Sequence, residues 1–175
     1  MPRDRTETGR LPGQDIILWS IRAACMCYLL ALIALRVQRR EAARLLWTAG
    51  CLLYLVHVWS AFAYKHVWSH TKAVEDTARQ TADMFGVNWG GGVWFNYLFT
   101  LIWSADVTWW WRNAAAYKRR ARWLDSMVHG YLAFMFFNGA VVFAKGPSRI
   151  VNALAAILLA IVWLSTRARQ GLTKR

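Results

Sequence analysis

The sequence lacks the local signatures of the common enzyme classes. It contains no glycine-rich nucleotide loop, no Gly-x-Ser-x-Gly elbow, no His-Glu-x-x-His pair and no set of histidine-rich boxes of the kind that a membrane di-iron oxygenase requires. Acidic residues are also scarce, with 9 against 22 lysines and arginines, and the formal charge at pH 7 is +13. The missing motifs leave the reaction and the ligand unassigned, whereas composition, charge and the depth of polar residues remain informative.

Cysteine is scarce as well, and its positions do not indicate a compartment. Cys25, Cys27 and Cys51 all fall inside long apolar stretches, where a thiol is usually a small buried side chain. A copper or redox role for Cys25 and Cys27 is disfavoured, because residues two apart point to different faces of a helix.

What the sequence does contain is five long apolar runs separated by basic clusters, at residues 16–35, 45–64, 93–111, 126–144 and 150–166. Each run is close to the ~20 residues that a helix needs to cross a hydrocarbon core of ~30 Å. With 57% apolar residues and 12 tryptophans, a soluble domain would have more apolar surface than it could bury. We therefore predict an all-α integral membrane protein with five transmembrane helices in one bundle.

The predicted bundle spans residues 15–166 and leaves no room for a second folded domain. Residues 1–14 form a polar N-terminal tail, and residues 167–175 form a basic cytoplasmic tail. A cleaved signal peptide is a disfavoured interpretation of the first run, because that run is longer than the usual ~7 to 15 apolar residues. The run also ends in Arg36, Arg39 and Arg40 and not in a small-residue cleavage site.

The charges predict an orientation, because cytoplasmic flanks of spanning helices carry an excess of lysine and arginine. Thirteen cations follow the first, third and fifth runs, whereas eight cations accompanied by six acids lie on the opposite side. We predict an outer N-terminus and a cytoplasmic C-terminus in a bacterial inner membrane. The cations lie at the ends of apolar runs and not on a soluble face, so nucleic acid is not an expected partner.

Two connections should form additional helices. Residues 65–85 lack glycine and proline and carry apolar residues at helical spacing, so the second span should continue as, or bend into, an outer amphipathic helix. Residues 113–123 are basic and alanine-rich and predict a short inner helix against anionic headgroups.

Four ionisable residues lie inside the predicted spans, where charges are costly and usually face a bundle interior. From helix rise, Arg22 and His57 lie ~9 to 11 Å from the outer boundary and could meet across the first hairpin. Asp106 and His129 lie ~7 to 9 Å from the inner boundary and form a second candidate pair. A haem held by His57 and His129 is disfavoured, because their depths differ by ~10 Å.

For Asp106 and His129 we favour a satisfied hydrogen bond between the third and fourth spans. A role in proton transfer or substrate binding is the functional alternative.

The motif His57-Val58-Trp59-Ser60 is repeated as residues 66–69, followed by His70. His66 and His70 have the i, i+4 spacing that lets one helix present two nitrogens to a transition metal. Two ligands do not complete a site, and the nearby acids are expected on other faces of the helix. A solvated pair of histidines is therefore favoured over a metal site.

Three classes of function fit the sequence. The first is a non-catalytic subunit or assembly partner of a larger membrane complex, the second a small metal-binding or redox membrane enzyme with an outer histidine site, and the third an oligomeric transporter. The first has the fewest requirements, because it accounts for the small size and the many packing aromatics. Its expected partners are the lipid bilayer and other membrane proteins or further copies of the chain. The sequence names no substrate, catalytic residue or cofactor.

Overall fold

The computed structural model describes residues 13–139, and every element in this range is a helix. The elements are α1 (Gln14–Arg36), α2 (Arg40–Ser60), the π-helix η1 (Ala61–His66), α3 (His70–Phe85), α4 (Gly92–Arg112), α5 (Ala114–Lys118) and α6 (Arg122–Phe137). The chain divides into two units, of which the first ends at Arg120 and the second begins at Ala121. The all-helical prediction is confirmed for this range. The predicted fifth span, the end of the fourth and both tails lie outside it.

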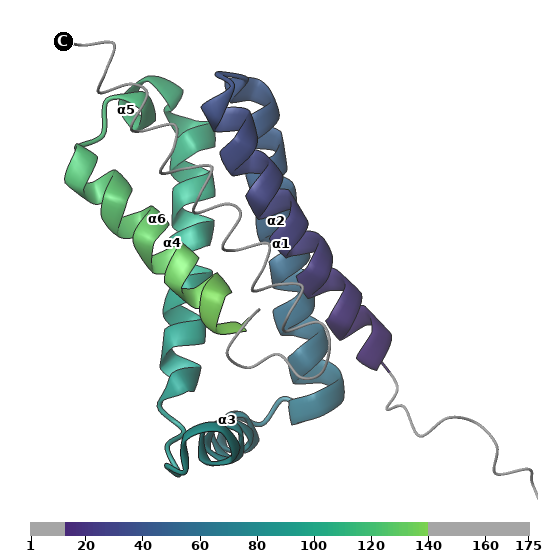
Figure 1. The fold of residues 1–175 in the computed structure, drawn as a ribbon. Coiled ribbons are helices and arrows are strands. Elements are labelled where there is room, and N and C mark those ends of the chain that lie inside the picture. The colour runs from purple at the N-terminus through teal and green to yellow at the C-terminus, as the bar shows by residue number, and fades with distance from the viewer. Residues whose placement is uncertain (1–12, 140–175) are drawn as a thin grey trace, which may run out of the picture. The chain divides into compact units, whose positions relative to one another are not determined.

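Helices α1 and α2 form an antiparallel hairpin (Figure 1). The buried face of each helix is rich in small residues, which allow two backbones to approach closely. In α1 this face consists of Ser20, Ala24, Tyr28, Ala31 and Ala34, and in α2 it includes Ala43, Trp47, Gly50, Cys51 and Tyr54. The spacing of three or four residues aligns each set along one stripe of its helix. The hairpin is therefore held by a continuous seam between the two helices.

Helix α4 packs on α2 along a second stripe of buried residues, Val93, Phe99, Trp103, Asp106 and Trp110. Gly50 lies at the point where both α1 and α4 contact α2. A Cβ atom at Gly50 would lie 3.0 Å from Cζ2 of Trp103 in α4 and 3.3 Å from Cβ of Cys27 in α1. The absence of a side chain at this position is what allows the three helices to pack closely.

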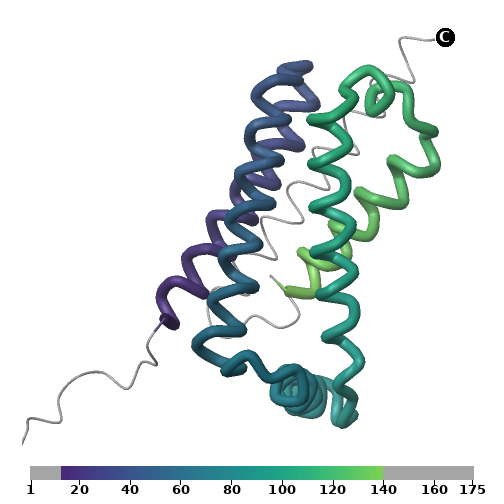
Figure 2. Tube along the Cα trace, turned by 180° about the vertical axis from the view of Figure 1, so that it is seen from behind, coloured from purple at the N-terminus to yellow at the C-terminus, as the bar shows by residue number. Residues whose placement is uncertain are grey.

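At the far end of α2 the chain turns sharply. The π-helix η1 ends at His66, and Val67 and Trp68 adopt left-handed conformations with φ of 50° and 57°. Ser69 then caps α3, because its side chain accepts a hydrogen bond from the backbone N–H of Lys72. As a result α3 lies across the ends of the long helices (Figure 2). The predicted outer amphipathic helix is thus confirmed as a helix, and its start is a bend.

Two helical stretches, Gln14–Arg36 and Arg40–His66, are long and apolar enough to cross a membrane. Only 22% and 28% of their apolar windows are buried within the chain, whereas the core helix of a soluble protein is mostly buried. This supports membrane association. Helix α4 has the length of a span and contains the polar residues Asn96 and Asp106, and it is not among the two stretches that are apolar enough. The arrangement of five spans remains a prediction.

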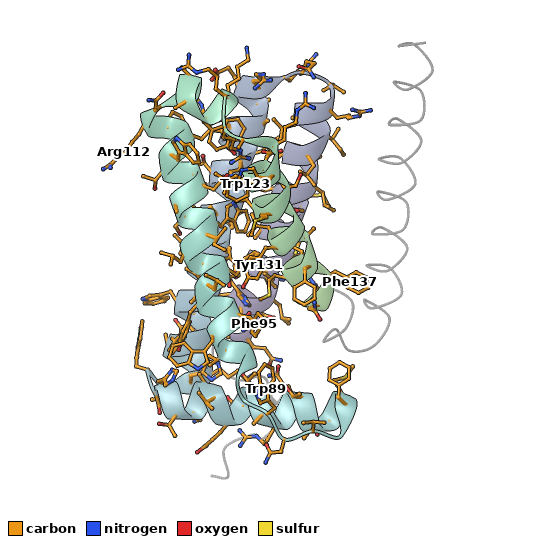
Figure 3. The ribbon with its side chains drawn as sticks, turned by 90° about the vertical axis from the view of Figure 1, so that its left-hand side faces the viewer. Trp89, Phe95, Arg112, Trp123, Tyr131 and Phe137 are labelled. Atoms are coloured by element: carbon orange, nitrogen blue, oxygen red, sulfur yellow. The ribbon has the colours of Figure 1, made fainter. Side chains whose placement is uncertain are left out.

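The described part of the second unit is mainly the helix α6. It has 16 residues, and Trp123, Tyr131 and Phe137 are distributed along its length (Figure 3). Past its end, the side-chain amide of Asn138 donates a hydrogen bond to the carbonyl of Phe134 at 2.8 Å. The start of the predicted fourth span is confirmed as helix, four residues earlier than expected.

Candidate functional site

The most developed polar site in the described structure surrounds Asp106, which is only 4% exposed. Its Oδ2 accepts hydrogen bonds from Nε1 of Trp47 at 2.9 Å and from the hydroxyl of Tyr117 at 2.8 Å. Its Oδ1 lies 2.5 Å from Nη1 of Arg120. Three donors from α2, α5 and the segment after α5 therefore converge on one carboxylate of α4.

A reversal of the chain after α4 brings two of these donors to Asp106. Asn113 leaves the helical conformation with φ of −148° and ψ of 79°, and its side chain accepts a hydrogen bond from the N–H of Ala116 at 2.8 Å. Asn113 thereby ends α4 and caps α5, as its short polar side chain favours. The five residues of α5 then return the chain toward the carboxylate.

Ring packing fixes the returning segment. The ring of Tyr117 stacks on Trp110 with centroids 4.6 Å apart and an interplanar angle of 7°. The guanidinium carbon of Arg120 lies over the same Tyr117 ring, 4.1 Å from its centroid. Trp110, Tyr117 and Arg120 therefore form a stack that positions both the hydroxyl and the guanidinium.

A cluster of aromatic rings lies next to the carboxylate. The side chains of Trp47 and Trp103 are fully buried, with ring centroids 5.6 Å apart. Tyr28 lies against both rings, at 5.4 and 6.2 Å. Tyr54 and Phe99 extend the cluster beyond Trp103. The surroundings of Asp106 are thus largely apolar on this side, which raises the energetic importance of each of its polar partners.

A buried charge is tolerated only when it is paired and hydrogen-bonded. Asp106 meets both conditions, because Arg120 supplies the opposite charge and Trp47 and Tyr117 supply neutral donors. The side chains of Asp106 and Arg120 are 3% and 4% exposed. The arrangement can hold α2, α4 and the segment after α5 together, and a proton-transfer role would require at least one of these bonds to open.

The structure gives Asp106 three hydrogen-bonding partners that the sequence analysis missed. The sequence analysis counted Arg120 only among the cations that follow the third run, whereas the reversal at Asn113 turns its side chain inward. The residue that could have indicated this reversal from the sequence is Asn113, because asparagine favours helix caps and Asn113 directly follows the tryptophan-rich span. His129 belongs to the second unit, where its Nε2 lies 3.7 Å from Oδ1 of Asp125. The pairing of Asp106 with His129 stays a prediction.

The first hairpin does not bring the side chains of Arg22 and His57 together as a buried pair. His57 is half-buried, and its Nδ1 lies 2.9 Å from the backbone carbonyl of Ile17. Arg22 is exposed, with its guanidinium carbon 5.2 Å from the centroid of the Trp19 ring. The prediction that Arg22 faces the interior is wrong for the described chain, because it lies two residues from both Ser20 and Ala24 and hence on the opposite face of α1.

His66 and His70 do not share one helix face, because the left-handed residues Val67 and Trp68 separate η1 from α3. His66 Nδ1 lies 2.9 Å from Oδ2 of Asp76, which also pairs with Arg79. His70 Nδ1 lies 2.8 Å from the hydroxyl of Tyr97.

The expected position of Asp76 on another face was also wrong, since the bend brings α3 back to His66. Within residues 13–139, no three His, Cys, Asp or Glu residues form a group that could hold a metal ion. Metal binding by His66 and His70 remains a prediction.

Comparisons with models of known protein families, with curated proteins and with solved structures give no match. The geometry of the Asp106 site and the exposed surfaces of the helices are therefore the features that bear on function.

Proposed function

We propose that this protein is a multi-pass membrane protein that serves as a non-catalytic subunit or assembly partner of a larger membrane complex. The proposal includes five spans, an outer N-terminus and a cytoplasmic C-terminus in a bacterial inner membrane. Its partners would be the lipid bilayer and either other membrane proteins or further copies of the chain.

The observation that carries this proposal is that both oxygens of the Asp106 carboxylate are engaged by other side chains of the fold. Both of its oxygens accept hydrogen bonds from side chains of the same chain, and its charge is matched by Arg120. A catalytic carboxylate must reach a substrate or exchange a proton, whereas this one joins three segments of the fold. The geometry therefore favours a structural role for the most deeply buried charge of the described chain.

The exposed face of α1 supports the same proposal. Trp19, Met26, Leu30 and Ile33 are all exposed large apolar side chains at spacings of three, four or seven residues. Such a stripe is suited to lipid or to another transmembrane helix. Arg22 lies within this stripe, and an intramembrane charge is costly unless it reaches a polar partner.

Purification of the tagged, full-length protein from its native membrane in a mild detergent tests the proposal. A particle much heavier than one chain with its detergent, containing defined proteins in fixed stoichiometry or a fixed number of copies, is the expected result. A monodisperse single chain, in each of several mild detergents and after cross-linking in intact membranes, would contradict the subunit role.

A metal-binding or redox enzyme is the second candidate. The contact between His66 and Asp76 favours it, because a carboxylate beside an imidazole is a common arrangement around protein-bound metals. Metal analysis and an absorption spectrum of the pure protein distinguish this candidate from the subunit role.

A further inference from the structure

One end of the first unit carries exposed cations from two segments that are distant in sequence. The turn between α1 and α2 and the short helix α5 both lie at the end opposite α3 (Figure 1). We call this surface the basic end. Its exposed cations are Arg36, Arg39 and Arg40 from the turn, together with Arg112, Lys118 and Arg119 from the end of α4 and from α5. Figure 3 shows Arg112 projecting away from α4.

The basic end has almost no acid to balance these charges. Residues 36–44 and 109–120 contain one acidic residue, Glu41. Its Oε2 lies 2.7 Å from Nη2 of Arg44, so Glu41 is already paired. The six exposed cations therefore produce a strongly positive surface that attracts anions.

Two further arginines near this end are engaged within the fold. Arg120 is buried against Asp106, and the guanidinium carbon of Arg44 lies 4.2 Å from the centroid of the Trp111 ring. Sequence alone does not separate these residues from Arg119 or Arg40. The structure shows which arginines hold the fold and which are free to contact a ligand.

Tryptophans lie beside the exposed cations. Trp111 is 48% exposed, and its indole N–H donates a hydrogen bond to Oγ1 of Thr48 at 2.8 Å. Trp109 is partly exposed and packs edge-on against Tyr117. Half-exposed tryptophans at the end of an apolar helix are typical of the headgroup level of a bilayer. The cations next to them would then lie at the depth of the lipid phosphates.

The turn between α1 and α2 also forms an open hollow of about 510 Å³, lined by Gln38, Arg39, Arg40, Glu41 and Ala42. Two of its five lining residues are exposed cations. A headgroup in this hollow would lie beside Arg39 and Arg40.

We propose that the basic end binds the headgroups of anionic phospholipids in the leaflet that it faces. The phosphate accepts hydrogen bonds from the arginines, the acyl chains lie along the apolar faces of α1, α2 and α4, and the tryptophans lie at the boundary between these regions. Each cation adds several-fold to the affinity for an anionic surface, so six cations from two segments make the surface selective over zwitterionic lipid. The proposal requires insertion in a bilayer and is independent of the subunit role.

The test compares the thermal stability of the full-length chain in neutral detergent before and after addition of phosphatidylglycerol, phosphatidylcholine or inorganic phosphate. Phosphatidylglycerol should raise the Tm and should remain bound through gel filtration, and the increase in Tm should shrink as salt screens the charges. An equal increase with phosphatidylcholine would overturn the proposal. An equal increase with inorganic phosphate would also overturn it, because it would assign the effect to a free-anion site.

Matched double variants locate the effect. Arg39→Gln with Arg40→Gln removes two charges from the turn, and Arg112→Gln with Arg119→Gln removes two from the other segment. Each pair should reduce both the lipid-dependent Tm increase and the retained phosphatidylglycerol by half or more. Lys65→Gln with Lys72→Gln removes two exposed cations at the α3 end and should leave both measurements unchanged. An equal loss in this control would show that net charge alone is responsible and would overturn the assignment.

Discussion

Nη1 of Arg120 lies 2.5 Å from Oδ1 of Asp106, which is 14 residues earlier in the chain. Both side chains are almost completely buried. The pair therefore closes a loop that contains the end of α4, the cap at Asn113 and the whole of α5. Removal of either charge should affect the entire loop.

Asp106→Asn should destabilise the protein by about 3 to 5 kcal/mol, because it removes the carboxylate charge that is paired with the buried guanidinium of Arg120. Tyr117→Phe removes one neutral donor and should cost only about 1 kcal/mol. Unfolding in a denaturing detergent, followed by tryptophan fluorescence, measures both changes.

Asp83→Asn is a matched control, because the same substitution is made at an exposed carboxylate of α3. It should change stability by less than about 0.5 kcal/mol. Arg120→Gln combined with Asp106→Asn should lose less than the sum of the two single variants. Strict additivity would show that the two charges do not interact.

Position 50 should tolerate only a small side chain in place of glycine. Gly50→Leu should destabilise the protein by about 1 to 3 kcal/mol or more, because the new side chain meets the fully buried Trp103 and the Cβ atom of Cys27. Gly50→Ala should cost less, since the better helix propensity of alanine offsets part of the crowding. The measurement is the detergent-unfolding midpoint.

Gly130→Ala provides the comparison, because a Cβ at Gly130 has no heavy atom within 4 Å and the residue lies inside α6. This variant should be neutral or stabilising by up to about 1 kcal/mol. A Gly50→Leu variant as stable as the unmodified chain would refute close three-helix packing at this point.

Reporter fusions should place the N-terminus outside and the C-terminus in the cytoplasm. The reason is the excess of cations after the first, third and fifth apolar runs. A periplasmic phosphatase fused to the C-terminus should be inactive, and a cytoplasmic fluorescent reporter at the same site should be active. Fusions after Arg40 and after Glu75 report on which side of the membrane the connections after the first and second spans lie. The reverse pattern would eliminate both the topology and the depth estimates for the ionisable residues.

If the chain binds a metal at the predicted histidines, substitution of both His66 and His70 by alanine should abolish the bound metal, measured as metal per chain. His66→Ala alone should have the larger effect, because His66 has Asp76 beside it, whereas Nδ1 of His70 contacts Tyr97. Tyr97→Phe is a control that removes this contact and keeps both imidazoles. Metal content unchanged by the double substitution would exclude this site.

The sequence predicted the helices well where apolar periodicity alone determines them. The ranges 16–35 and 93–111 lie within α1 and α4, and the amphipathic pattern of residues 65–85 led to α3. It left open whether the second span bends into this helix, and it did not place the bend at Val67 and Trp68, because neither residue type favours a left-handed conformation. The relation between His66 and His70 was wrong for this reason.

The Asp106 site shows a similar limit. The sequence identified Asp106 as energetically unfavourable because it lies well inside an apolar run, and this inference required only the sequence of that run. Its partners depend on where the chain reverses at Asn113 and on how α2 and α4 are aligned, and both are properties of the tertiary structure. Arg119 and Arg120 are indistinguishable by composition, yet one is exposed and the other is buried.

The contact between Gly13 and Tyr64 has a consequence for biogenesis. Gly13 has a φ of +81°, and a Cβ at this position would lie 2.1 Å from the Tyr64 ring. The α1–α2 hairpin is thus joined at one end by its turn and at the other by this contact, and all of its seam is made by residues up to 64. We expect the hairpin to enter the bilayer and pair as a unit during synthesis, before the ribosome has released α4, so that α4 is added to a preformed two-helix surface.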